Sequence, residues 1–229
     1  MIRLIYSPAW FYGKDIVSDV ISAITLILIC IFSYKCYRMQ KNKNHLFLSI
    51  SFLTMAISFI FKILMNFTLY YRITETAKIG FVTFSYPTMR STDAFFFFGF
   101  LFHRLLMLFG LYLLYSIYQK QNMPTFILTS FLIMMLTYYS QSAYYIFYLT
   151  ALVLLALITA SLVGSYKKSK FKMTKMFAAS FGIIGLSQIF FILVYIRVQY
   201  YVLGEIIQLI GYLLLLASFV MVLRDAKKN

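Results

Sequence analysis

Seven membrane-length apolar segments constrain the fold of this chain more than any other feature. They run approximately over residues 17–34, 46–70, 94–118, 124–139, 143–166, 175–199 and 203–223. A helix needs about 20 apolar residues to cross about 30 Å of hydrocarbon, so the fourth segment is at the short limit. Helix is expected in every segment because a bilayer leaves unpaired backbone groups without partners. The sequence therefore predicts an all-α, polytopic bundle of seven transmembrane helices.

The composition excludes a soluble domain. Of the 229 residues, 62% are apolar and 12% are charged, whereas soluble domains are close to half apolar and a quarter charged. Almost every residue lies within or beside an apolar segment, so we expect one integral membrane domain over residues 1–229. The stretch from Met1 to Ser18 lacks the features of a cleaved signal peptide, so the first segment is expected to stay as a signal anchor.

The basic residues gather in alternate loops. Most Lys and Arg residues follow the first, third, fifth and seventh segments, and all the acidic residues except Asp225 lie on the other side. This positive-inside pattern predicts an N-terminus outside and a C-terminus in the cytoplasm. It also explains the net charge of +15, so no nucleic acid is expected as a partner. A surface for anionic lipid or a protein partner is the alternative interpretation. The expected location is the cell membrane, as a multi-pass protein of a prokaryotic cytoplasmic membrane, with the lipid bilayer as partner.

An internal repeat relates two of the segments. The stretch from Ser51 to Leu64 aligns without gaps with Ser180 to Leu193, and seven of the fourteen positions are identical. Shorter matches pair 33–35 with 165–167, and Gly110 with Gly211. We therefore predict a first repeat over about 17–118, a linking helix over about 124–139 and a second repeat over about 143–223. The single linking span makes the repeats parallel, and a binding site is expected between them near the bilayer midplane.

This three-one-three layout resembles that of the SWEET sugar transporters and the microbial rhodopsins. The chain lacks the Pro-Gln pair of the related PQ-loop transporters, and Gly211 to Leu216 contains no lysine for a retinal Schiff base. The closing block from Tyr201 to Leu216 resembles small uncharacterised archaeal seven-helix membrane proteins, which implies no particular activity.

Polar residues inside the membrane mark candidate sites because they are costly to bury in hydrocarbon. Arg104 lies near the middle of the third segment, Lys62 in the outer third of the second and Glu205 near the outer start of the seventh. The repeat alignment makes Arg104 and Glu205 equivalent, so we predict a contact between them. It is interpreted either as a structural ion pair or as part of an outward-facing pocket for a small polar or anionic ligand. The candidate ligand-binding residues are Arg104, Glu205, His103, Lys62, Gln208, Gln188 and Asn66.

Enzyme and metal-site motifs are missing from the sequence. The two histidines, His45 and His103, lie at different depths, and no zinc-protease, hydrolase or phosphate-loop motif occurs. Cys30 and Cys36 lie on different faces of one predicted helix, so they cannot pair with each other. We expect no enzymatic activity, no metal and no cofactor.

Three functional hypotheses follow. The first is a ligand-binding or sensor-like protein with an outward-facing polar pocket, which would act through a cytoplasmic or membrane protein partner. The second is a small-solute transporter with its site between the repeats, and the third is a structural or accessory membrane subunit. The inner halves of two segments, 105–114 and 213–223, are almost purely apolar. That pattern favours a closed outer pocket over a path through the membrane.

Overall fold

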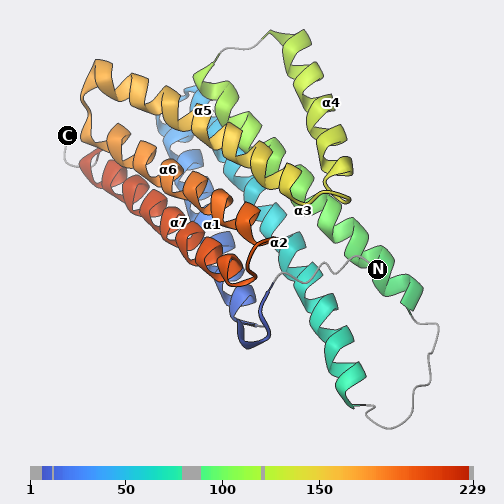
Figure 1. Cartoon of the computed structure of the whole chain (residues 1–229). Helices are drawn as coiled ribbons and strands as arrows, with labels where there is room; N and C mark the ends of the chain where they lie inside the picture. Colours follow the sequence, from blue (N-terminus) through green and yellow to red (C-terminus); the bar gives the residue numbers. More distant parts are fainter. Residues whose placement is uncertain (1–6, 12, 79–88, 120–121, 227–229) are drawn as a thin grey trace.

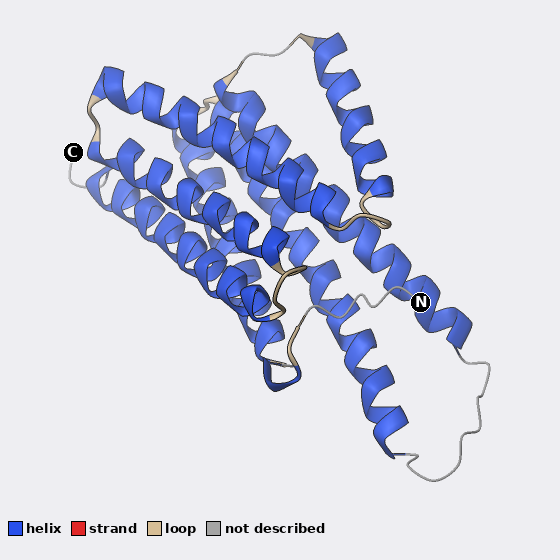
Figure 2. Ribbon diagram, viewed as in Figure 1, coloured by secondary structure: helices blue, strands red, loops and turns tan. Residues whose placement is uncertain are grey.

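The computed structural model describes residues 7–11, 13–78, 89–119 and 122–226, and in these the chain forms seven α-helices and no strand (Figures 1 and 2). After a short 3₁₀ turn, η1 (Ala9–Phe11), come α1 (Lys14–Gln40), α2 (Lys43–Lys78), α3 (Met89–Tyr118), α4 (Met123–Tyr139), α5 (Tyr145–Ser169), α6 (Lys172–Leu193) and α7 (Gln199–Ala226). Six of them are long and apolar enough to cross a membrane. The predicted all-helical, multi-pass membrane class is confirmed. With 17 residues, α4 is shorter than the others and reaches only about 26 Å.

Some helix ends differ from the predicted segments. The second and third segments belong to longer helices, because α2 continues to Lys78 and α3 begins at Met89. These two helices extend beyond the rest of the bundle (Figure 1). The sixth helix is shorter than predicted: it ends at Leu193, and a turn precedes Gln199 at the start of α7.

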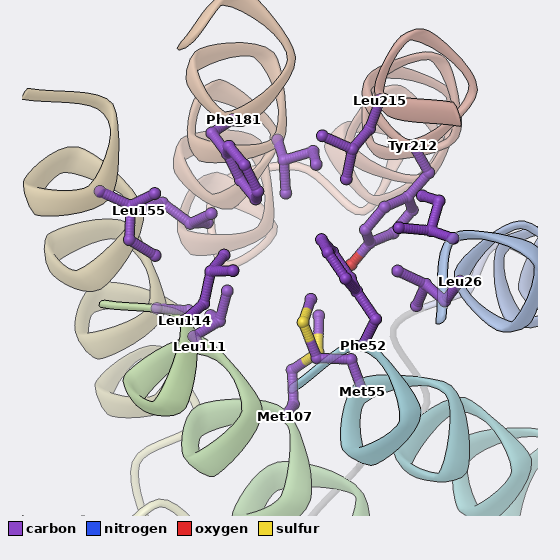
Figure 3. Close-up of a cluster of buried hydrophobic side chains, with 14 of the residues drawn as sticks. Leu26, Phe52, Met55, Met107, Leu111, Leu114, Leu155, Phe181, Tyr212 and Leu215 are labelled. Carbon is purple, nitrogen blue, oxygen red and sulfur yellow. The ribbon is translucent and has the colours of Figure 1, made fainter. Parts of the chain in front are cut away.

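Six of the helices form a ring. α2 packs along both α1 and α3, and α6 packs along both α5 and α7. Contacts between α1 and α7 and between α3 and α5 close the ring. Figure 3 shows apolar side chains from these helices pointing toward a common centre. α4 lies outside the ring, and only Ile133 and Thr137 of this helix are buried.

The first helix carries its polar side inward. Its buried residues include Asp15, Ser18, Asp19 and Ser22. Over residues 17–31 its exposed residues are large and apolar, among them Val17, Ile21, Ile24, Leu28 and Ile31. Polar groups facing a bundle interior, with apolar side chains outside, are typical of helices surrounded by lipid. The structure therefore supports contact between this helix and a bilayer.

Two pairs of helices approach each other closely at glycines. A Cβ atom added to Gly110 of α3 would lie 3.1 Å from the backbone oxygen of Ser51 on α2. A Cβ added to Gly211 of α7 would lie 3.4 Å from the backbone oxygen of Ser180 and 3.2 Å from the backbone nitrogen of Ile184 on α6. The hydroxyl of Ser51 also donates to the Gly110 carbonyl at 2.6 Å. Glycine at these crossings lets the helix backbones come together.

Candidate functional site

The strongest polar feature of the interior is a lysine between two carboxylates. Lys62 Nζ on α2 donates to Asp19 Oδ1 on α1 and to Glu205 Oε1 on α7, both at 2.7 Å. The side chains of Asp19, Glu205 and Lys62 are 0%, 3% and 12% exposed. Asn66, one turn beyond Lys62, donates to Asp19 Oδ2 at 3.3 Å. Asp19, Lys62 and Glu205, here termed the charged triad, join three helices of the ring.

The charged triad lies inside the helical bundle. Asp19 is five residues from the start of α1 and Glu205 six from the start of α7, which places both about 8–9 Å from those helix ends. Charges at such a position are costly unless they are paired. Lys62 pairs with both carboxylates, so the triad has one more negative group than positive groups.

The structure does not pair Arg104 with Glu205, contrary to the prediction. Arg104 Nη1 donates instead to the carbonyl of Ser140 at 2.6 Å, and Ser140 is the C-cap of α4. The guanidinium carbon also lies 3.6 Å from the ring centroid of Phe100 and 5.1 Å from that of Phe147. A cation is favourable at the C-terminal end of a helix. Arg104 thus fastens the end of α4 to α3.

The short length of α4 accounts for the position of Arg104. Arg104 is 14 residues from the last residue of α3, or about 21 Å along the helix. Because α4 is only 17 residues long, it ends at this level of α3 and not at the end of the longer helices. The sequence analysis recognised the fourth segment as short but paired Arg104 by the repeat alignment alone, and it therefore missed this contact.

His103 is bonded to the neighbouring helix. The Ser58 hydroxyl on α2 lies 3.0 Å from the His103 carbonyl and 2.8 Å from His103 Nδ1, and this nitrogen is 3.0 Å from the Ser58 carbonyl. A carbonyl can only accept, so we assign the proton of the neutral ring to Nδ1. Nε2 then remains a hydrogen-bond acceptor.

Four of the candidate residues line one small cavity at the centre of the ring, here termed the central cavity. They are Lys62, His103, Gln188 and Gln208, on α2, α3, α6 and α7. The rest of the wall is Phe59, Met107, Leu111, Phe147, Tyr148, Ala151, Leu155 and Phe191. The volume is about 20 Å³, which is room for a single water molecule. Arg104, Glu205 and Asn66 are not among the lining residues.

The two glutamines of the central cavity hold few hydrogen bonds. Gln188 Nε2 lies 3.3 Å from the Ile184 carbonyl and 3.1 Å from Ser187 Oγ, and Gln208 Nε2 lies 3.4 Å from the Tyr212 hydroxyl. All these partners are on the same helix as the glutamine. Within the described residues, neither carboxamide oxygen accepts a hydrogen bond. Both are therefore available to a guest with N–H or O–H groups.

Sequence reasoning missed Asp19 as a site residue and used it only for topology. The signal was present in the spacing of Asp15, Ser18, Asp19 and Ser22, which lie at positions i, i+3, i+4 and i+7 of an otherwise apolar helix. Such a spacing puts polar groups on one face. A one-sided polar face in a membrane segment predicts an inward-facing partner.

The structure thus separates the seven predicted residues into three places. Lys62, Asn66 and Glu205 meet at the charged triad. Lys62, His103, Gln188 and Gln208 meet at the central cavity, and Arg104 lies at the end of α4. Compared with family models, curated proteins and solved structures, the chain has no match.

Proposed function

We propose that the chain is a ligand-binding or sensor-like membrane protein whose ligand site is the central cavity beside the charged triad. One observation carries this proposal: polar side chains from four helices, distant in sequence, converge on one cavity within an apolar bundle. Each of these side chains is costly inside a membrane, and such residues in membrane helices are commonly functional.

Of the small polar or anionic ligands that the sequence suggested, the charges around the central cavity favour a polar one, neutral or cationic, over an anion. Lys62 is already bonded to two carboxylates, so an anion beside it would also face Asp19 and Glu205. The oxygens of Gln188 and Gln208 and the free nitrogen of His103 are acceptors. A small polar molecule with several N–H or O–H groups matches this set. The cavity has room for only one water, so binding requires the wall to move.

An apolar layer favours binding over passage through the membrane. Met55, Ile184, Tyr212 and Leu215 lie one to two turns from the central cavity, and all are at most 1% exposed. Figure 3 shows Met55, Tyr212 and Leu215 among the packed side chains of the core. A ligand in the central cavity would therefore change helix packing without crossing the bundle. The change would be passed to a cytoplasmic or membrane protein partner.

The first test is a thermal-unfolding screen of purified protein against amino acids, sugars, polyols, amines and small anions. We expect a polar, non-anionic compound to raise the unfolding temperature of the wild type but not of Gln208→Leu. Gln199→Leu serves as the control, because Gln199 is exposed at the start of α7 and its variant should keep the shift. If Gln208→Leu is more stable than wild type and no compound distinguishes the two, the central cavity is a packing feature and the proposal fails.

We further propose that α1–α3 and α5–α7 are two parallel repeats joined by α4, as the alignment predicts. The two glycine crossings support this proposal. Gly110 meets Ser51 and Met55, and Gly211 meets Ser180 and Ile184, which are aligned pairs. A small-solute transporter is the second candidate function, because the central cavity lies between these two groups of helices, where transporters with internal repeats bind substrate.

The proposed topology has the N-terminus outside and α4 crossing the membrane. Lys168→Cys and Ser142→Cys are placed at exposed positions at opposite ends of α5, in a chain lacking Cys30 and Cys36. We expect an impermeant maleimide to label position 168 from the cytoplasm only and position 142 from outside only. Labelling of position 142 from the cytoplasm would mean that α4 does not cross, and six spans would remain.

A further inference from the structure

A second cavity opens at the other end of the ring. Its lining residues are Ser33, Cys36, His45, Leu48, Phe52, Tyr118, Phe177, Phe181, Phe219 and Val222, and its volume is about 140 Å³. Cys36, His45, Tyr118 and Val222 are partly exposed, whereas Ser33, Phe52, Phe181 and Phe219 are buried. The lining is largely apolar and aromatic. This space is here termed the end pocket.

The end pocket runs inward from the helix ends. His45 is two residues from the start of α2, whereas Phe52 and Phe181 are each nine residues from the start of α2 and α6. The pocket therefore reaches about 13 Å into the bundle. On three helices one or two turns of buried apolar side chains, including Met55, Ile184 and Tyr212, separate it from the central cavity. The two cavities are distinct sites.

A buried hydroxyl in the wall of the end pocket lacks a partner. Ser33 is 1% exposed, and its Oγ makes no hydrogen bond within the described part of the chain. Other helical hydroxyls, such as those of Thr137, Ser180 and Ser218, donate to the carbonyl four residues earlier. Buried polar groups are normally bonded, so this unbonded hydroxyl, on a residue that lines the cavity, can bond to a guest once its side chain turns toward the space.

We propose that the end pocket binds an aromatic alcohol or phenol, a ring-sized molecule with one oxygen that hydrogen-bonds to the Ser33 hydroxyl. An engineered apolar cavity of about 150 Å³ in another protein takes up benzene, so a single ring fits the available volume. The walls already contain aromatic pairs in edge-to-face geometry: the ring centroids of Phe177 and Phe219 are 4.9 Å apart, and those of Phe52 and Phe219 are 5.7 Å apart. Such surroundings favour an aromatic guest.

Cys36 provides a built-in reporter of occupancy because it lines the end pocket near its mouth. The experiment measures the rate of Cys36 modification by a small maleimide in lipid nanodiscs, with Cys30 replaced by alanine. The probes are p-cresol and toluene, which have similar shapes but differ in the hydroxyl. We expect p-cresol to slow the modification at concentrations about tenfold lower than toluene, as one hydrogen bond would give.

Variants of Ser33 test whether the hydroxyl and the pocket are responsible. In Ser33→Ala, the p-cresol concentration that slows Cys36 modification should rise to that of toluene. In Ser33→Leu neither probe should protect Cys36, because the leucine side chain fills the pocket. Ser161→Ala on α5, a half-buried serine outside the end pocket that donates to its own helix, should behave like the parent. Lys168→Cys, in a chain lacking the native cysteines, reports any general effect of the probes on the bilayer and should be unaffected.

Three outcomes would overturn the proposal. The first is equal protection by p-cresol and toluene in the parent protein. The second is protection that survives in Ser33→Leu, which would mean that the probes act elsewhere. The third is no protection by either probe, which would mean that the end pocket is closed or filled by a lipid chain.

Discussion

Replacing Lys62 by methionine is expected to lower the free energy of unfolding by about 3–5 kcal/mol, the cost typical of removing one partner from a buried charge pair. Methionine keeps an unbranched side chain only one atom shorter but leaves Asp19 and Glu205 buried without a cation. Both carboxylates bond to Lys62 Nζ at 2.7 Å, so the single change removes two ion pairs. Chemical or thermal unfolding in nanodiscs measures the loss.

Two further variants give this experiment its controls. Lys168→Met removes an exposed lysine near the end of α5 and should change stability by less than about 0.5 kcal/mol. The triple variant Asp19→Asn, Lys62→Met, Glu205→Gln removes all three charges and should recover most of the loss, because no uncompensated charge remains. If the loss in the triple variant equals the sum of the losses in the three single variants, the charged triad does not act as one unit.

The second large effect is expected at the glycine crossings. Gly110→Val and Gly211→Val should each lower the free energy of unfolding by about 1–3 kcal/mol, as overpacking of a filled interior does. At both positions a new side chain would meet backbone atoms of the neighbouring helix at 3.1–3.4 Å, and backbone cannot move aside as a side chain can. Unfolding of each variant under the same conditions measures these losses.

Gly164 is the matched control for these substitutions. A Cβ added there has no neighbouring atom within 4 Å, so Gly164→Ala should stabilise α5 by up to about 1 kcal/mol, the ordinary difference in helix propensity. If Gly110→Val and Gly211→Val are tolerated as well as Gly164→Ala, the close crossings are not needed for folding. Similar losses at both crossings would support the proposed repeat.

The membrane class and most helix positions followed from the sequence because they depend on local composition. A run of about 20 apolar residues forms a helix in lipid whatever its neighbours are, and six of the seven predicted segments correspond to long apolar helices. The helix ends were predicted less accurately than the helix positions. The second helix continues to Lys78 and the sixth stops at Leu193, since no strong capping or proline signal marks either position.

Part of the candidate site was also predictable. Lys62, His103, Gln188 and Gln208 were selected because polar groups inside membrane helices are costly, and all four line the central cavity. Their partners were not predictable in the same way. The sequence placed Lys62 in the outer third of the second segment, but it did not identify Asp19 or Glu205 as the groups to which Lys62 bonds.

The sequence by itself determined that this is a multi-helix membrane protein with a few buried polar groups, because hydrophobicity and helix length act over neighbouring residues. Only the tertiary structure decided which polar groups meet. That outcome depends on the rotation and depth of each helix against the others, as Arg104 shows by reaching Ser140 at the end of the short α4 and not Glu205. The rotation and depth of a helix are set by its packing against helices that are distant in the sequence. The periodic pattern along one helix carries no information about that packing.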